Sequence, residues 1–360
     1  MNNNLRPPAL ASLHRQLGAE LIPLPVAAPE EGLLVPADYG DVAAEYQALT
    51  SGCGVIDRCW AAALELTGAD RQRFLNGQVT CDLKPLTPGQ GTYGFFTTAK
   101  GRVHADVAVL AGPEELWLEV PALRAEALRE HLQRYIIADR VEIRSRPELA
   151  ITLAGPRAAE LVPGAPAEPW AHGRVTVHGV EARAVCQEGL GVPAITLWLP
   201  PEAAGELIPA LLEMPLDSGE RPRPVGYRAL DARRVEAGIP WFGRDFAADN
   251  FPQETGLEQA VSYTKGCYLG QEVVARLHYR GQVSRQVRGL RFDGPPPQAG
   301  TALLLDDREV GAVSSALRSP ALGQSIGLGV IQRRGFAPGT QLQLAGGGTA
   351  VVVELPFSLG

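Results

Sequence analysis

The sequence contains very little lysine. Of its 33 basic residues, only Lys84, Lys100 and Lys265 are lysines, and all the others are arginines. The two side chains are not interchangeable, because the lysine ammonium is a compact, mobile point charge. A chain that uses arginine wherever a positive charge suffices keeps lysine where that ammonium is needed, so these positions are candidates for function. With three examples, a chance distribution is the alternative explanation.

Blocks of basic residues and long apolar runs are also missing. The net charge is −7, and binding of nucleic acid through its phosphates needs clustered positive charge, so we expect no nucleic-acid partner. No apolar run reaches the ~18–20 residues that a membrane span needs, and Met1 to Pro8 contain no apolar core of a signal peptide. The sequence therefore predicts a cytoplasmic protein that does not associate with membranes.

Cysteine and histidine are sparse. Five cysteines form an odd set without a CxxC pair or a repeated spacing. Neither a disulfide framework nor a zinc site is indicated, and His104 and His278 have no second metal ligand at a helical or hairpin spacing. We therefore expect no metal, and any thiol chemistry has to come from a single cysteine.

The chain is long enough for more than one domain. Its 360 residues exceed the ~250–300 residues at which a single core stops growing. After a Pro- and Ala-rich lead-in at 1–35, strand and helix patterns alternate through two regions, 36–145 and 146–285. The stretch 286–360 alternates short Val/Leu segments with Gly/Pro/Asp turns, which is typical of an antiparallel barrel. We expect an α+β fold with two lobes closed by a C-terminal antiparallel β-barrel.

Within the two lobes, the periodicity of the apolar residues predicts individual elements. Strands are expected at 62–66, 91–97, 103–110, 116–120, 141–144, 150–153 and 194–199, and near Val175 and Ala184. Helices are expected at 42–51, from Asp70 through Leu75, around 128–135 and at 202–212.

The surroundings of Cys267 predict a reactive thiol. A strand-like stretch at 261–263 is followed by Thr264-Lys265-Gly266 and by helical composition from 267 to 277, so Cys267 is expected in the first turn of a helix. There the unsatisfied backbone N–H groups and the helix dipole favour an anion, and Lys265 adds a positive charge, so the pKa of the thiol should be depressed. The alternative is a small buried cysteine at a strand–helix junction.

The same segment resembles a family signature. The pattern K-G-C-[FY]-x-G-Q-E of the YgfZ family, which are folate-binding relatives of the glycine-cleavage T-protein, is matched by Lys265, Gly266, Cys267, Tyr268, Gly270, Gln271 and Glu272. The resemblance implies a three-domain, T-protein-like ring that binds tetrahydrofolate or a one-carbon derivative. It also implies a function in the maturation or repair of iron-sulfur enzymes, with Cys267 as the functional thiol beside Lys265. The implied partners of a monomer are iron-sulfur client proteins or assembly factors.

Further segments extend the resemblance from about residue 39 to 357. Residues 234–240, R-V-E-A-G-I-P, resemble a segment shared with the T-protein, and 91–94 with 99–106 resemble the hairpin that carries its paired aspartates beside the folate. The resemblance places Tyr93, Asp106, Arg234 and Glu236 around the cofactor. The residues alone allow a second interpretation of Arg234 and Glu236, as a solvated charge pair on one face of an extended segment.

Three departures from the T-protein pattern affect the expected function. Ala105 precedes Asp106 where the T-protein has two adjacent aspartates, the segment 189–196 lacks the carboxylates that contact the pterin, and Leu230 replaces an arginine. Neighbouring residues of a strand point to opposite faces, so Asp106 cannot replace a side chain at position 105. We therefore expect an iron-sulfur maturation factor. The alternatives are a folate-dependent aminomethyl or methyl transferase that uses Asp106, and a folate-responsive adaptor that performs no chemistry.

Overall fold

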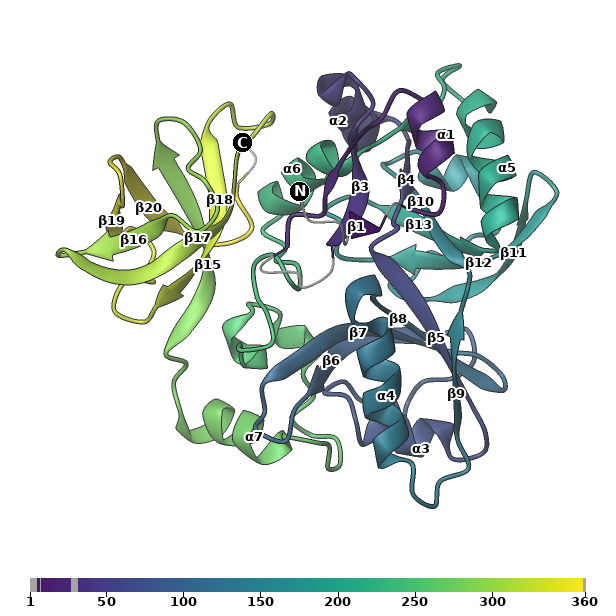
Figure 1. Ribbon diagram of the computed structural model, residues 1–360, viewed down its shortest axis with the longest axis horizontal. Helices are drawn as coiled ribbons and strands as arrows, with labels where there is room; N and C mark the ends of the chain where they lie inside the picture. Colours follow the sequence, from purple (N-terminus) through teal and green to yellow (C-terminus); the bar gives the residue numbers. More distant parts are fainter. Residues whose placement is uncertain (1–4, 7, 27–31, 359–360) are drawn as a thin grey trace.

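The chain folds into two lobes that each contain a sheet, and a barrel that lies to one side of them (Figure 1). The computed structural model describes residues 5–6, 8–26 and 32–358; residues 1–4, 7 and 27–31 of the expected lead-in and 359–360 of the expected barrel lie outside the described residues. The α+β architecture with a C-terminal antiparallel barrel is confirmed. None of the helices in these ranges is long and apolar enough to span a lipid bilayer.

The first lobe is a five-stranded antiparallel sheet of order β6-β7-β8-β5-β9. Alternate apolar residues of its strands pack against two helices in a core that includes Leu64, Phe96, Leu118 and Leu128. The strand expected at 91–97 is confirmed residue for residue. The elements are β5 (Ala61–Thr67), α3 (Arg71–Asn76), β6 (Gly91–Thr97), β7 (Val103–Ala111), β8 (Glu115–Pro121), the 3-10 helix η1 (Ala122–Arg124), α4 (Ala125–Tyr135) and β9 (Glu142–Arg146).

The second lobe is a six-stranded sheet of order β11-β12-β13-β10-β4-β14. Helix α5 opens with Pro201, whose fixed φ suits a first helical turn, and packs Leu207 and Leu211 onto the sheet. The elements are α2 (Val42–Ser51), β4 (Gly54–Asp57), β10 (Leu149–Ala154), the 3-10 helix η2 (Ala158–Leu161), β11 (His172–Val177), β12 (Val180–Gln187), β13 (Ala194–Leu199), α5 (Pro201–Glu213), β14 (Arg223–Pro224) and α6 (Tyr227–Glu236).

The sheets do not follow the order of the chain. Strand β4 precedes the first lobe in sequence but pairs antiparallel with β10, with Asp57 opposite Ile151, so the first lobe is inserted into the second. The N-terminal region adds α1 (Ala11–Gln16), which packs Leu13 on the core of the second lobe. It also adds a three-stranded sheet of β1 (Leu5–Arg6), β3 (Gly32–Asp38) and β2 (Glu20–Pro23). The domain boundaries at 35, 145 and 285 stay predictions.

The segment after α6 returns to the first lobe. Its elements are the 3-10 helices η3 (Pro252–Glu254) and η4 (Glu258–Ala260) and helix α7 (Gln271–Arg280). Phe246, Val261 and Val274 of this segment pack against Phe95 and Val103 of the first sheet. The motif around Cys267 therefore lies on the first lobe, although it follows the second lobe in sequence.

The C-terminal region is a closed antiparallel barrel of order β15-β18-β17-β16-β19-β20. Its interior is filled by Leu290, Val313, Ile331 and Val352, among others, and a bulge in β17 between Val313 and Ser315 bends the strand. The strands are β15 (Arg285–Asp293), β16 (Ala302–Leu305), β17 (Arg308–Arg318), β18 (Ser325–Gln332), β19 (Gln341–Leu344) and β20 (Thr349–Val353).

Candidate functional site

Asp106 lies on the face of β7 that is turned toward the second lobe. Leu110 on the same face packs, together with Trp117 of β8, against Val185 and Trp198 of the second sheet. Ala105 points the other way, into the core of the first lobe. Side chains alternate along a strand, so Asp106 lies between the sheets. Ala105, the position that departs from the T-protein pattern, belongs to the core of the first lobe.

Asp106 is held by a single hydrogen bond from a side chain. The Tyr93 hydroxyl donates to Asp106 Oδ2 at 2.9 Å, whereas Asp106 Oδ1 is buried without a hydrogen-bond partner among the described residues. Burial raises the pKa of Asp106 to about 6, against the lowering effects of the Tyr93 hydrogen bond and of the Arg58 charge. The Tyr93 ring stacks on Trp170, with centroids 5.7 Å apart and an interplanar angle of 11°. A carboxyl group that titrates near neutral pH therefore lies beside an aromatic wall.

A second polar group, which we call the Glu119 cluster (Arg58, Glu119 and Gln187), adjoins Asp106. The Glu119 charge acts on the pKa of Asp106 in the raising direction. Arg58 Nη2 donates to Glu119 Oε1 at 2.5 Å, and Gln187 Nε2 donates to the same oxygen at 3.3 Å. No motif identified these residues. The one signal in the sequence is a glutamate within the otherwise apolar stretch Leu-Trp-Leu-Glu-Val.

The alternative interpretation of Arg234 and Glu236, as a solvated charge pair on an extended segment, is wrong. Helix α6 covers both residues, and both side chains are fully buried. Arg234 Nη1 donates to Asp245 Oδ2 at 2.5 Å, and Nη2 donates to Ser315 Oγ at 2.8 Å. Because Ser315 belongs to β17, Arg234 joins α6 to the barrel.

Glu236 makes a second connection at the same junction. Its Oε2 accepts from the Tyr46 hydroxyl at 2.7 Å and from Arg233 Nη1 at 2.6 Å. Its Oε1 accepts from Ser319 Oγ at 2.5 Å and from the backbone N–H of Ala321 at 3.1 Å. The structure thus brings Tyr93 and Asp106 together, whereas Arg234 and Glu236 lie at the junction of the second lobe and the barrel. A role of these two residues in folate binding stays a prediction.

Cys267 is exposed and lies before the helix in which it was expected. Helix α7 begins only at Gln271, and residues 261–263 form no strand. The late start has a local cause at Gly270, which has a φ of 82° and where a Cβ atom would lie 2.3 Å from the carbonyl oxygen of Thr98. Only glycine fits a left-handed position so close to another backbone, so the chain makes this turn before the helix begins.

Lys265 is fastened to the first lobe. Its Nζ donates to the carbonyl oxygens of Asn76, Val79 and Cys81 at 2.7, 2.8 and 2.5 Å, and burial lowers the pKa of Lys265 to about 8. The ammonium also lies 5.4 Å from the ring centroid of Tyr268. These contacts attach the motif to the first lobe, two residues before the exposed Cys267.

The rest of the motif supports the same turn. Gln271 Oε1 accepts from the backbone N–H of Tyr268 at 3.3 Å, and Glu272 is exposed on the first turn of α7. Gly266 lies beside the Lys84 ammonium, which would be 3.5 Å from a Cβ atom at that position, an ordinary contact distance. Of the three lysines of the chain, Lys265 belongs to the motif and Lys84 lies beside it.

The other four thiols are less accessible. Burial raises the pKa of Cys53 and of Cys81 to about 12, and it also raises the pKa of Cys59 and of Cys186. Cys267 is the cysteine of this chain that faces solvent. Among the five cysteines, Cys267 is therefore the thiol most accessible to another protein.

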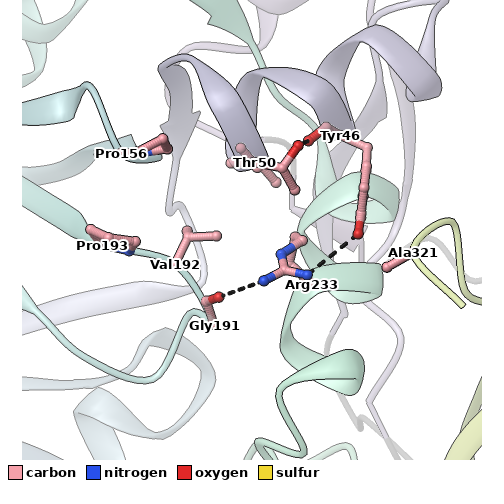
Figure 2. Close-up of a pocket in the computed structure, with 9 residues that line it drawn as sticks. Tyr46, Thr50, Pro156, Gly191, Val192, Pro193, Arg233 and Ala321 are labelled. Carbon is pink, nitrogen blue, oxygen red and sulfur yellow. Dashed lines mark hydrogen bonds between the residues drawn. The ribbon is translucent and has the colours of Figure 1, made fainter. Parts of the chain in front are cut away.

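A cleft of about 430 Å³ lies at the junction of α2, α6 and a barrel loop (Figure 2). Arg233 extends into it and donates to the carbonyl oxygen of Gly191 at 3.1 Å and to the Tyr46 hydroxyl at 3.3 Å. The charge of this arginine is neutralised by Glu236, and no residue that lines the cleft belongs to the polar groups around Asp106. In the part of the chain that the structure describes, no group of three or more His, Cys, Asp or Glu side chains could hold a metal ion. We therefore place the candidate site at Asp106.

Comparisons with known proteins agree on one family. Residues 12–265 match the GCVT N-terminal domain, and residues 285–358 match the glycine cleavage T-protein C-terminal barrel domain. An aminomethyltransferase of Pelodictyon phaeoclathratiforme is 29% identical, with 97% of each chain covered. A putative chloroplastic transferase of Arabidopsis thaliana is 25% identical, over 91% of this chain and 76% of the relative. The crystal structure of the glycine cleavage system aminomethyltransferase T from Bartonella henselae has the same fold, with a TM-score of 0.88, 22% identity and 98% of each chain covered. These matches support the T-protein relationship and do not single out the YgfZ group within it.

Proposed function

Because this chain belongs to the glycine cleavage T-protein family, we propose that it binds tetrahydrofolate or a one-carbon derivative between its two sheets and transfers a one-carbon unit, as an aminomethyl or methyl transferase. The observation that carries the proposal is Asp106, a buried carboxyl group with one unpaired oxygen beside an aromatic wall. The aminomethyltransferase names of its relatives favour this function over iron-sulfur repair.

The residues present fit a folate. The pterin of tetrahydrofolate is a flat ring system whose edge carries N–H donors, and its recognition requires acceptors and an aromatic or apolar wall. Asp106 Oδ1, Glu119 Oε2 and Gln187 Oε1 are buried acceptor atoms without partners among the described residues. Tyr93 and Trp170 supply the wall. These acceptor atoms therefore complement the N–H donors on the edge of the pterin ring.

Asp106 is suited to hold and move a proton. Efficient general acid–base groups have a pKa near the working pH, and burial raises the pKa of Asp106 to about 6. The Tyr93 hydroxyl fixes Oδ2, so Oδ1 is the oxygen that is free to exchange a proton with an amine nitrogen. Folate supplies the nitrogen that accepts the carbon, and the polar groups of the chain orient it.

The proposal is tested by titration with tetrahydrofolate, followed by calorimetry and thermal melting. A ligand that binds only the native state raises the free energy of unfolding by about 2.7 kcal/mol at a concentration of 100 times Kd, so the melting temperature should rise by several degrees. The p-aminobenzoylglutamate fragment, which lacks the pterin, is the matched control and should give a much smaller shift. Absence of heat and of a melting shift at millimolar tetrahydrofolate would refute folate binding.

A second candidate function rests on the exposure of Cys267. The folate-binding fold would then support the maturation or repair of iron-sulfur enzymes through a thiol that contacts client proteins or assembly factors. The anchored Lys265 and the turn at Gly270 present this cysteine at the surface, which suits a reaction with another protein. A cytoplasmic location and a monomeric state complete this proposal.

Cys267→Ser distinguishes the two functions. The variant should lose at most about 1 kcal/mol of stability, because the substitution is mild and exposed, and it should still bind tetrahydrofolate. If the second candidate holds, Cys267→Ser fails to restore iron-sulfur enzyme activity in a strain that lacks its own relative of this protein, whereas the control Cys186→Ser restores it. If Cys267→Ser restores iron-sulfur enzyme activity fully and still transfers the one-carbon unit, the iron-sulfur function through Cys267 is refuted and the transferase function is supported.

A further inference from the structure

Three buried polar atoms of the Glu119 cluster have no hydrogen-bond partner among the described residues. They are Glu119 Oε2, Gln187 Oε1 and Arg58 Nε. A buried polar group left unpaired costs roughly 1–3 kcal/mol, and native proteins retain few of them. Three such atoms on residues that hydrogen-bond to one another indicate a binding site in which a ligand supplies the missing partners.

The bonds already made fix which atoms remain. Arg58 Nη2 and Gln187 Nε2 both donate to Glu119 Oε1, and Arg58 Nη1 donates to Thr196 Oγ1 at 3.3 Å. Gln187 Nε2 also donates to the carbonyl oxygen of Glu188 at 3.3 Å, which sets the orientation of the amide. The cluster therefore offers two acceptors, from Glu119 and Gln187, and one donor, from Arg58.

The three residues come from different parts of the fold. Arg58 follows β4, Glu119 lies on β8, and Gln187 ends β12. The cluster thus joins the first sheet to the second. Glu119 lies opposite Ala108 of β7, two residues along the strand from Asp106 and on the same face of the sheet. This proximity makes the cluster part of the same site as Asp106.

We propose that the Glu119 cluster determines pterin specificity in this chain, with Glu119 and Gln187 accepting from the 2-amino and N3–H donors and Arg58 Nε donating to the 4-oxo group. The inference rests on the proposed binding of folate. It explains how a pterin is read although segment 189–196 lacks carboxylates, because Glu119 supplies one from the other lobe. The two acceptors and one donor match the pattern of a 2-amino-4-oxo ring edge.

Trp170 stacks on Tyr93 and packs against the apolar residues between the two sheets. The unpaired atoms are closed to solvent, whereas Trp170 is partly exposed and has a φ of 60°. A bulky residue in that conformation is held under strain.

The test compares tetrahydrofolate binding to the wild type, Glu119→Gln and the control Glu115→Gln by calorimetry. Glu119→Gln keeps the size of the side chain but turns a donor toward the donors of the ring, so Kd should rise about tenfold to a hundredfold, given 1.4 kcal/mol per factor of ten. Glu115 lies on the same strand, paired with Arg183 at 2.7 Å, and its variant should bind like the wild type.

The outcomes separate this inference from the function on which it rests. If the wild type does not bind tetrahydrofolate, the proposed function fails. If the wild type binds and Glu119→Gln binds equally well, the assignment of the cluster is overturned while folate binding stands. Should Glu119→Gln not fold, Gln187→Met removes one acceptor without touching a charge. An unchanged Kd in that variant would overturn the inference, and a rise of about tenfold would support it.

Discussion

Replacement of Asp106 by asparagine is expected to reduce one-carbon transfer by about 10²–10⁴-fold, the usual contribution of a positioned acid–base group. The amide can still accept the Tyr93 hydrogen bond, which is 2.9 Å long in the wild type, but it cannot exchange a proton. Tetrahydrofolate should therefore still bind, with a Kd within a few fold of the wild-type value. The measurement is the rate of aminomethyl transfer to tetrahydrofolate at saturating folate, with Kd determined separately by calorimetry.

The same variant should be more stable than the wild type at alkaline pH. The pKa of Asp106 rises from 3.8 to about 6 on folding, so the ionised carboxylate destabilises the folded state by on the order of 3 kcal/mol, at 1.36 kcal/mol per pKa unit. Well below pH 3.8 the group is protonated in both states, and it has no effect on stability there. As the pH rises through 6, the wild type loses stability relative to Asp106→Asn. Denaturation at pH 4 and at pH 8 measures the difference.

Asp249→Asn is the control for both measurements, since Asp249 is a carboxylate with 70% of its side chain exposed. It should change neither the transfer rate nor the pH dependence of stability. If Asp106→Asn retains full transfer activity, Asp106 is not the proton-carrying group, and the function based on Cys267 gains support.

Arg234→Met is expected to destabilise the protein by about 3–5 kcal/mol, because it leaves a buried carboxylate without its partner. Arg234 and Asp245 are both fully buried, and their ion pair at 2.5 Å lies between α6 and the barrel. Without tetrahydrofolate, the variant should unfold at a lower temperature and at a lower urea concentration than the wild type. The barrel should separate from the lobes before they unfold.

Arg228→Met is the matched control on the same helix. Arg228 pairs with Glu20 at 2.8 Å and with Asp38, but 48% of the Arg228 side chain is exposed. Solvent screens such pairs, so Arg228→Met should cost less stability than Arg234→Met. If Arg234→Met and Arg228→Met lose the same amount of stability, the burial of Arg234 does not make its ion pair more important than an exposed one. A small loss in Arg234→Met would mean that Asp245 finds another partner or becomes protonated.

Local periodicity predicted most of the fold. The strands at 91–97 and 194–199 have the expected limits, because alternating or continuous apolar runs between turns leave few other conformations. The same reasoning failed at Arg234 and Glu236, where a motif with two charges suggested an extended segment and the chain forms α6. Burial of both charges depends on Asp245, Ser315 and other residues distant in sequence, which no local pattern reveals.

The candidate site was predictable only in part. Tyr93 and Asp106 were identified through the resemblance of their segments to the T-protein hairpin. They lie on neighbouring strands of that hairpin, which explains their contact. Arg58, Glu119 and Gln187 were missed, because they come together only when the two sheets pack face to face. Cys267 is exposed and its role stays a prediction, but its expected place in a helix was wrong because the turn at Gly270 depends on a close approach to Thr98.

The pairing of β4 with β10 has a consequence for synthesis on the ribosome. β4 leaves the exit tunnel before any part of the first lobe, yet its partner Ile151 follows the whole of that lobe. The first lobe has all its strands between residues 61 and 146, so it can fold while β4 waits unpaired. An early strand with free backbone groups is open to pairing with another nascent chain. Prompt folding of the inserted lobe brings β10 to β4 and shortens the time for which that edge is exposed.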